Sequence, residues 1–134
     1  KLLKILLVDD EMSWIHSYYK LINDSFPDLF DFQIATNSVD GLKLAETEDF
    51  DLIITDMQME KTENNLYAGE NLLRGLKSKG IKADIIIASG APEISEIAKR
   101  NNITHYVSKT SLINNPVRLK LKIEKIIEKT SKIC

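Results

Sequence analysis

Five short apolar runs divide this chain of 134 residues into regularly alternating segments. The runs cover residues 2–8, 32–36, 52–55, 85–88 and 105–107. Several are unbroken stretches of Ile, Leu and Val, not alternations of apolar and polar residues. Unbroken apolar strands are typical of parallel sheets, because helices cover both faces of such a sheet. The pattern therefore predicts a five-stranded parallel sheet.

The segments between the runs have the three- and four-residue apolar spacing of helices that pack on a core. The predicted helices cover residues 13–25, a segment around 39–45 capped by Asn37 or Ser38, residues 66–79 with Gly80 after them, a segment that begins at Pro92, and a last one that begins at Asn115 and Pro116. Five strand–helix units with right-handed crossovers give a doubly wound α/β fold of three layers.

The composition is that of one ordinary globular domain, with 43% hydrophobic and 28% charged residues. A net charge of -2 predicts no direct binding of nucleic acid. No apolar run approaches the roughly 20 residues that span a bilayer, so we expect no membrane contact. The single cysteine, Cys134, allows no intrachain disulfide, so nothing favours an oxidising compartment.

Polar residues follow four of the five apolar runs at the point where each predicted strand ends. Asp9 and Asp10 follow the first run, Asp56 follows the third, Ser89 the fourth and Lys109 comes soon after the fifth. The carboxyl ends of parallel strands meet at one edge of a doubly wound sheet, and ligands bind there. We therefore expect these five side chains to converge.

Three neighbouring carboxylates repel one another and require a cation. Ligation by oxygen alone suits Mg2+, whereas zinc and copper prefer nitrogen or sulfur ligands, which are absent from these positions. A metal and a lysine beside a carboxylate also suit phosphoryl transfer, with the carboxylate as nucleophile. Each residue alone has an ordinary explanation as a turn, cap or surface residue. Those explanations do not account for the occurrence of all five polar residues at the ends of predicted strands.

Four segments carry a resemblance to a known family: Leu7-Val8-Asp9-Asp10-Glu11, residues 51–59 around Asp56, Ile87-Ala88-Ser89-Gly90 and Tyr106-Val107-Ser108-Lys109. Together they resemble the motif set of receiver domains from two-component response regulators, such as chemotaxis receivers. The resemblance covers essentially the whole chain. It implies a flavodoxin-like fold, one receiver (phosphoacceptor) domain over residues 1–134, and a cytoplasmic phosphoprotein of phosphorelay signal transduction.

The resemblance also implies a role for each matched residue around the metal. Asp56 matches the phosphoacceptor, which becomes an aspartyl phosphate, and it also binds Mg2+. Asp10 matches a direct metal ligand, and Asp9 acts on the metal indirectly. The backbone carbonyl of Gln58 matches a further ligand.

Three more residues match the part of the family motif that responds to the phosphoryl group. Lys109 pairs with a phosphoryl oxygen or with Asp56, and Ser89 hydrogen-bonds the phosphoryl group. Tyr106 then turns inward, which alters the surface of the fourth helix, the fifth strand and the last helix. The alternative for Tyr106 is ordinary half-buried packing with a solvated hydroxyl.

The implied function is to receive a phosphoryl group from a sensor histidine kinase or a histidine phosphotransfer protein, and to act on a downstream output domain or protein. Such a chain catalyses only its own phosphorylation and dephosphorylation, so we do not expect an enzyme. The alternative is a receiver-like scaffold that is not phosphorylated. A haloacid-dehalogenase-type phosphatase would carry an Asp-x-Asp-x-Thr pattern after the first strand, which Asp9-Asp10-Glu11-Met12-Ser13 does not fit. An FMN module would need a phosphate loop rich in Ser, Thr and Gly there, and two aspartates would repel the phosphate.

The chain departs from the family pattern at two places. Thr110 follows Lys109 where many members have a proline after a cis bond. A cis bond before a non-proline residue costs about 2.5–4 kcal/mol, so either the site imposes it or the bond is trans. Residues 60–69 are polar and contain about five extra residues, which predicts either a plain surface loop or a contact specific to one partner.

Overall fold

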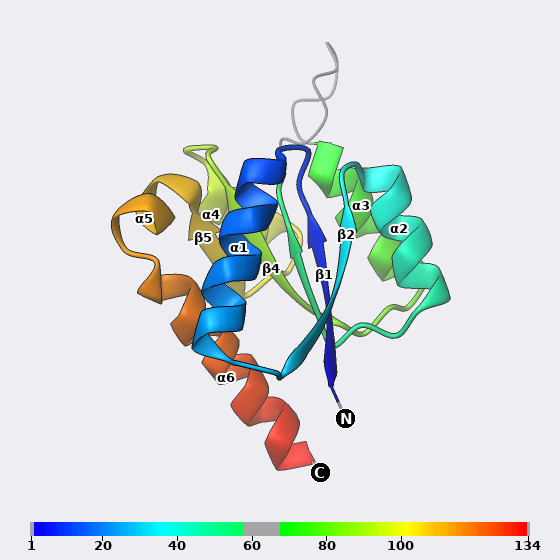
Figure 1. The fold of residues 1–134 in the computed structure, drawn as a ribbon. Helices are drawn as coiled ribbons and strands as arrows, with labels where there is room; N and C mark the ends of the chain where they lie inside the picture. The colour runs from blue at the N-terminus through cyan, green and yellow to red at the C-terminus, as the bar shows by residue number, and fades with distance from the viewer. Residues whose placement is uncertain (1, 58–67, 134) are drawn as a thin grey trace.

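The computed structural model describes residues 2–57 and 68–133, in which strands and helices alternate along the chain (Figure 1). The elements are β1 (Leu3–Val8), α1 (Met12–Ser25), β2 (Phe30–Ala35), α2 (Ser38–Thr47), β3 (Leu52–Thr55), α3 (Ala68–Ser78), β4 (Asp84–Ser89), α4 (Ile94–Arg100), β5 (His105–Ser108), α5 (Lys109–Asn114) and α6 (Val117–Ile133). Every predicted strand is present, with its ends shifted by no more than two residues.

The five strands form one parallel sheet in the order β2-β1-β3-β4-β5. This order confirms the predicted doubly wound fold. In the register of β1 and β3, Val8 lies opposite Thr55. The backbone amide of Asp56 donates to the carbonyl oxygen of Val8 at 3.0 Å. The carboxyl ends of these two central strands are therefore level, and the residues that follow them emerge at the same edge.

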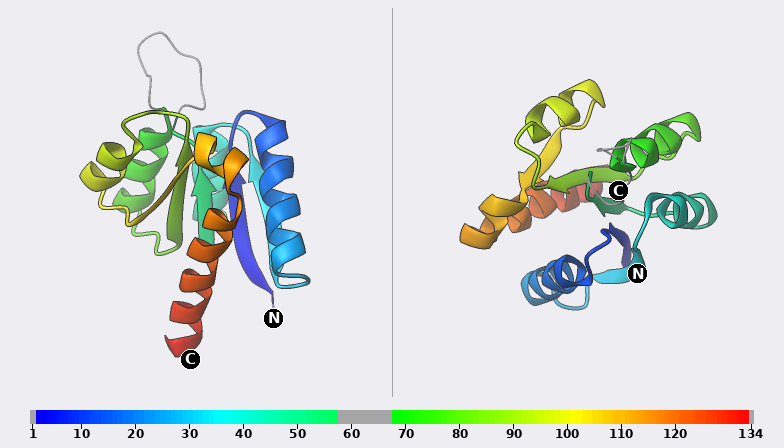
Figure 2. Two further views of the ribbon diagram at one scale, coloured as in Figure 1. Left: turned by 90° about the vertical axis from the view of Figure 1, so that its left-hand side faces the viewer. Right: turned by 90° about the horizontal axis from the view of Figure 1, so that it is seen from above.

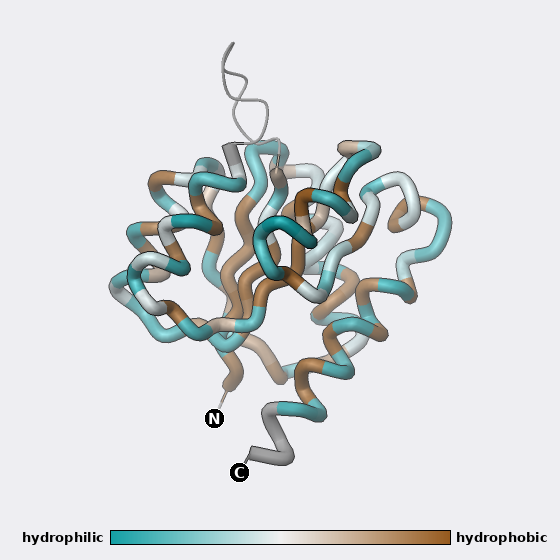
Figure 3. The backbone as a smooth tube through the Cα atoms, turned by 180° about the vertical axis from the view of Figure 1, so that it is seen from behind, coloured by the Kyte–Doolittle hydropathy of each residue, from teal (hydrophilic) through white to brown (hydrophobic). Residues whose placement is uncertain are grey.

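Helices cover both faces of the sheet, as the view from above shows (Figure 2). On one face α1, α5 and α6 pack a core that includes Ile15, Leu112 and Ile123 against the strands. On the other face α2, α3 and α4 form two further clusters with the strands, around Leu72 and Ile97. Unlike the edge strand β2, which contains Asp31 and Gln33, the central strands β1, β3 and β4 are mainly apolar (Figure 3). Burial on both faces explains why their apolar runs do not alternate.

Side-chain and glycine caps set several helix ends where the sequence predicts them. The Asn37 side chain accepts a hydrogen bond from the backbone amide of Asp40 at 2.8 Å, which confirms Asn37 as the cap of α2. Gly80 follows α3 with a φ of 68°, a left-handed conformation that favours glycine. Helix α4 begins at Ile94, two residues after the predicted start at Pro92, because Pro92 and Glu93 form the preceding turn.

The connection after β5 differs from the prediction. A short helix, α5, begins at Lys109 itself and comes before the predicted last helix, which begins at Val117. Ser108 caps α5 by accepting a hydrogen bond from the amide of Ser111 at 3.5 Å. The described residues contain no cis peptide bond, so the bond between Lys109 and Thr110 is trans. The backbone therefore enters α5 without the proline that many family members have after the lysine.

The described part of the chain ends far from the edge where the strands finish. β1 starts and α6 ends at the lower end of the molecule in Figure 1, whereas the carboxyl end of β1 lies at the upper end. Most of the predicted long loop, residues 60–67, falls outside the described residues. Among the helices that are described, none is both long enough and apolar enough to pass through a membrane.

Candidate functional site

Three carboxylates meet at the carboxyl edge of the sheet. Asp9 and Asp10 follow β1 and Asp56 follows β3, and one oxygen of each lies within 4.8 Å of the others. Asp9 is fully buried and Asp56 is 4% exposed, while Asp10 is exposed to solvent. The predicted convergence of these strand-end acids is confirmed. An oxygen-only donor set of this charge fits a hard divalent cation such as Mg2+.

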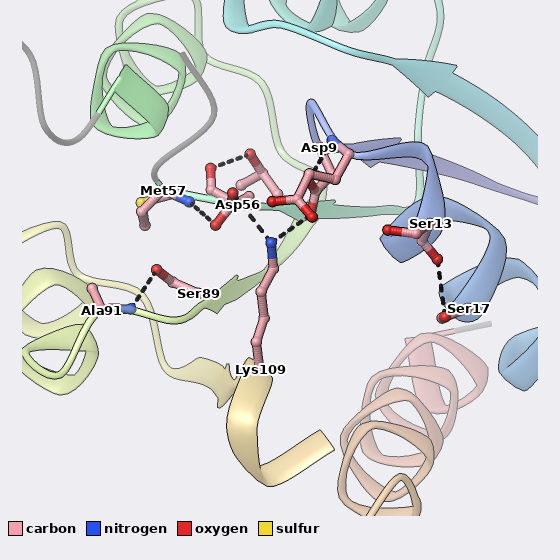
Figure 4. A network of polar contacts seen from close by, with 10 residues as sticks. Asp9, Ser13, Ser17, Asp56, Met57, Ser89, Ala91 and Lys109 are labelled. Atoms are coloured by element: carbon pink, nitrogen blue, oxygen red, sulfur yellow. Dashed lines mark hydrogen bonds and ion pairs between the residues drawn. The ribbon is translucent and has the colours of Figure 1, made fainter. Parts of the chain in front are cut away.

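Lys109 supplies the positive charge inside this cluster. Its Nζ atom lies 2.8 Å from Asp9 Oδ2 and 3.3 Å from Asp56 Oδ2 (Figure 4). The side chain of Lys109 is only 11% exposed, so water screens these ion pairs weakly. The contact to Asp9 is an ion pair without hydrogen-bond alignment. One ammonium group among three carboxylates leaves an excess of negative charge.

Backbone amides fix the other oxygen of each buried aspartate. Asp9 Oδ1 accepts a hydrogen bond from the amide of Glu11 at 3.0 Å, and Asp56 Oδ1 accepts one from the amide of Met57 at 2.8 Å. Each carboxylate therefore has one oxygen bound by the backbone and the other directed at Lys109 (Figure 4). The Oδ2 atoms of Asp9 and Asp56 thus share one movable side chain, Lys109, as a partner.

Ser89 and Tyr106 occupy different places relative to the acidic cluster. Ser89 ends β4, is fully buried, and its Oγ accepts a hydrogen bond from the amide of Ala91 at 3.1 Å. It lies opposite Ser108 in the register of β4 and β5, next to the start of α5 at Lys109.

Tyr106 is 37% exposed, with Lys122 Nζ 5.8 Å from its ring centre. Gln58, the predicted backbone ligand, lies outside the described residues.

Two contributors to the site were not identified from the sequence. Trp14 in α1 places its ring centre 4.9 Å from Lys109 Nζ. Gly69 in α3 packs against the backbone of Asp56 and Met57, and its amide donates to the Met57 carbonyl oxygen at 2.9 Å. Neither residue lies at a strand end, which was the signal that located the others.

The surroundings of Asp10 shift the pKa of its carboxyl group. Although the Asp10 side chain reaches solvent, the protein around it reduces its hydration; this desolvation, and then the nearby charges of Asp9 and Glu11, raise the pKa of Asp10 above its ordinary value. A raised pKa in the folded state means that the folded protein binds this proton more tightly than the unfolded chain does. Asp10 therefore reduces the stability of the metal-free protein as the pH rises through that pKa.

Asp10→Asn is expected to raise the free energy of unfolding of the metal-free protein at about pH 7, because it removes a repelled charge. The advantage over the wild type should shrink as the pH falls through the raised pKa of Asp10, because the wild-type side chain then takes up its proton. Urea unfolding in the presence of EDTA measures both values. Asp24→Asn, at an exposed position of α1, is the control and should show no such trend. A variant less stable than the wild type at neutral pH would contradict the repulsion.

A comparison with family models decides which family shares this arrangement. The model for the response regulator receiver domain matches residues 5–124. The chain belongs to the response regulator receiver domain family. It is thus a receiver domain of two-component signalling systems, in keeping with phosphorelay signalling. A search among curated proteins gives no match.

Solved receiver domains share the fold of this receiver over nearly its whole length. A CheY-like receiver domain protein from Methanospirillum hungatei JF-1 is 25% identical, with a TM-score of 0.76, and the match covers 98% of this chain and 99% of that one. A receiver domain from Clostridium thermocellum is 23% identical, with a TM-score of 0.77 and coverage of 99% and 100%. The N-terminal domain of a Wolinella succinogenes protein is 26% identical, with a TM-score of 0.75 and coverage of 98% and 99%.

Proposed function

We propose that this chain is a cytoplasmic phosphorelay switch that accepts a phosphoryl group on Asp56. The donor is a sensor histidine kinase or a histidine phosphotransfer protein, and residues 1–134 act as one receiver domain. One observation carries the proposal: the carboxylates of Asp9, Asp10 and Asp56 gather at one edge with the Lys109 ammonium between two of them. A carboxylate nucleophile and a cation at such a distance suit phosphoryl transfer.

The transfer forms a bond between Asp56 Oδ2 and phosphorus and breaks the bond between phosphorus and the donor's leaving atom. Oδ1 keeps its hydrogen bond to the Met57 amide, so the carboxylate is held while Oδ2 attacks. Lys109 leaves Asp56 Oδ2 and pairs with a phosphoryl oxygen, and Ser89 donates its hydroxyl to another. Asp56 is 4% exposed, so the move of Lys109 also opens access to the nucleophile.

A Mg2+ ion would neutralise the phosphoryl oxygens during transfer. Asp10 and Asp56 would bind it directly with the backbone carbonyl of Gln58, and Asp9 would act through a shared contact or water. Water later cleaves the aspartyl phosphate, which returns Asp56 and releases phosphate. The chain thus acts on its own carboxylate and not on a separate substrate, so we do not propose an enzyme with independent turnover.

The phosphoryl group would act on a surface formed by α4, β5 and α6. When Ser89 turns to the phosphoryl group, Tyr106 is free to move inward from its exposed position, which shifts the balance between two conformations of this surface.

A groove of about 560 Å³ lies beside Tyr106. The described residues that line this groove include three cations, Arg118, Lys122 and Lys125, and none of them is a carboxylate. The output domain or protein is therefore expected to present acidic side chains to this surface.

Incubation with Mg2+ and acetyl phosphate, followed by intact mass measurement, tests the proposal. The wild type should gain one phosphoryl group, and Asp56→Asn or EDTA should abolish the gain. Asp24→Asn should retain it, because Asp24 lies on the exposed side of α1. An unphosphorylated scaffold would gain nothing with the wild type, and a phosphatase would consume the donor continuously. Either result would contradict the proposed function.

A further inference from the structure

The ammonium group of Lys109 contacts a third group besides the two carboxylates. Its Nζ atom lies 4.9 Å from the ring centre of Trp14, which is within the distance for a cation–π interaction. Trp14 is the only tryptophan of the chain, and tryptophan provides the strongest such interaction among the aromatic residues. The ammonium therefore contacts an uncharged group as well as two carboxylates.

The position of the Trp14 ring follows from the start of α1. The amides of Trp14 and Ile15 both donate to the carbonyl oxygen of Glu11, at 3.0 and 3.3 Å, so the first helical turn begins directly after the acidic pair. Within α1 the Tyr18 ring lies 5.9 Å from the Trp14 ring, and Trp14 is partly buried against the core. Only one helical turn thus separates Asp9 and Asp10 from the Trp14 indole.

We propose that Trp14 is a positioning residue for Lys109. The carboxylates that attract Lys109 are also the candidate ligands of a divalent cation. A bound cation neutralises these carboxylates and weakens their hold on the ammonium. The attraction to the indole does not depend on their charge, so Trp14 keeps Lys109 at the site when its ion pairs weaken. This role rests on the proposed function, because it serves the arrival of the phosphoryl group.

The location of the Lys109 side chain can be measured without any phosphoryl donor. An aromatic ring shifts the NMR signals of protons over its face upfield, so the Hε protons of Lys109 should resonate upfield of those of the other lysines. Lys109→Met identifies the signal by removing it. The shift should disappear in Trp14→Leu and persist in reduced form in Trp14→Phe, both without metal and with saturating Mg2+. An unchanged signal in Trp14→Leu overturns the proposal.

The effect on transfer is measured as the initial rate of acetyl phosphate labelling at saturating Mg2+. Trp14→Leu should be slower by about fivefold, with Trp14→Phe between it and the wild type, in the order of their cation–π strength. Tyr19→Leu replaces an exposed aromatic of the same helix and should keep the wild-type rate. Urea unfolding compares the stability of all variants. The Phe variant tests the role even if the Leu variant fails to fold.

The two hypotheses fail in different ways. A wild-type protein that gains no phosphoryl group contradicts the proposed function, while the upfield signal of Lys109 would still place its ammonium over Trp14. Equal labelling rates in the wild type, Trp14→Phe and Trp14→Leu would overturn the positioning role and leave Asp56 as the phosphoacceptor.

Discussion

Lys109→Met is expected to lower the free energy of unfolding of the metal-free protein by about 3–5 kcal/mol at neutral pH. Lys109 Nζ lies 2.8 Å from Asp9 Oδ2 and 3.3 Å from Asp56 Oδ2, and both aspartates are almost fully buried. Methionine keeps an unbranched apolar side chain, so the variant loses the charge more than the packing. The loss arises because two buried carboxylates lose their ion pairs with Lys109. Urea unfolding in EDTA measures it.

Added Mg2+ distinguishes this charge effect from lost packing. A bound cation would neutralise the carboxylates, so the deficit of Lys109→Met should shrink on addition of Mg2+. Lys20→Met, at an exposed position of α1, should stay within about 0.5 kcal/mol of the wild type. A deficit that is the same with and without Mg2+ would show that packing is responsible.

Gly69→Ala is expected to destabilise the protein by about 3 kcal/mol, the upper end of the usual cost of overpacking. A Cβ atom at position 69 would overlap the backbone oxygen of Asp56 and lie 2.6 Å from the Cα atom of Met57. These are backbone atoms at the end of a buried strand, so they cannot move aside as a flexible side chain can. Helix α3 must shift away, or Asp56 must move with its carboxylate.

The two consequences of Gly69→Ala are measured separately, by urea unfolding and by acetyl phosphate labelling of Asp56. Labelling is expected to slow even where the protein is still fully folded, because the nucleophile is displaced. Gly90→Ala is the stability control, since a Cβ atom there meets nothing within 4 Å. If Gly69→Ala unfolds at the wild-type urea concentration, the close approach of α3 to the Asp56 backbone is not a constraint.

The sheet was predictable because its strands are defined by sharp changes in polarity. Leu52, Ile53 and Ile54 are apolar and Thr55 is β-branched. Asp51 and Asp56 flank these residues, so the limits of β3 follow from the sequence alone. Helix α5 was not predicted. It has six residues, with Leu112 buried and Ile113 72% exposed, which is too short for a helical period to emerge.

The convergence of the charged residues was predictable from topology, whereas their contacts were not. Parallel strands bring Asp9, Asp56 and Lys109 to one edge whatever their side chains do. Sequence spacing does not determine how each helix is rotated about its axis or how closely it packs against the sheet. Trp14 has the spacing of an ordinary apolar-face residue of α1, and Gly69 that of a loop glycine. Their roles depend on tertiary packing alone.

The positions of the two described ends have a practical consequence for attachment. Because β1 begins and α6 finishes at the pole opposite the acidic cluster, an affinity tag, fluorophore or neighbouring module joined at either end is anchored away from the aspartates (Figure 1). A sample immobilised through such a tag leaves the edge with the acidic cluster pointing into solution.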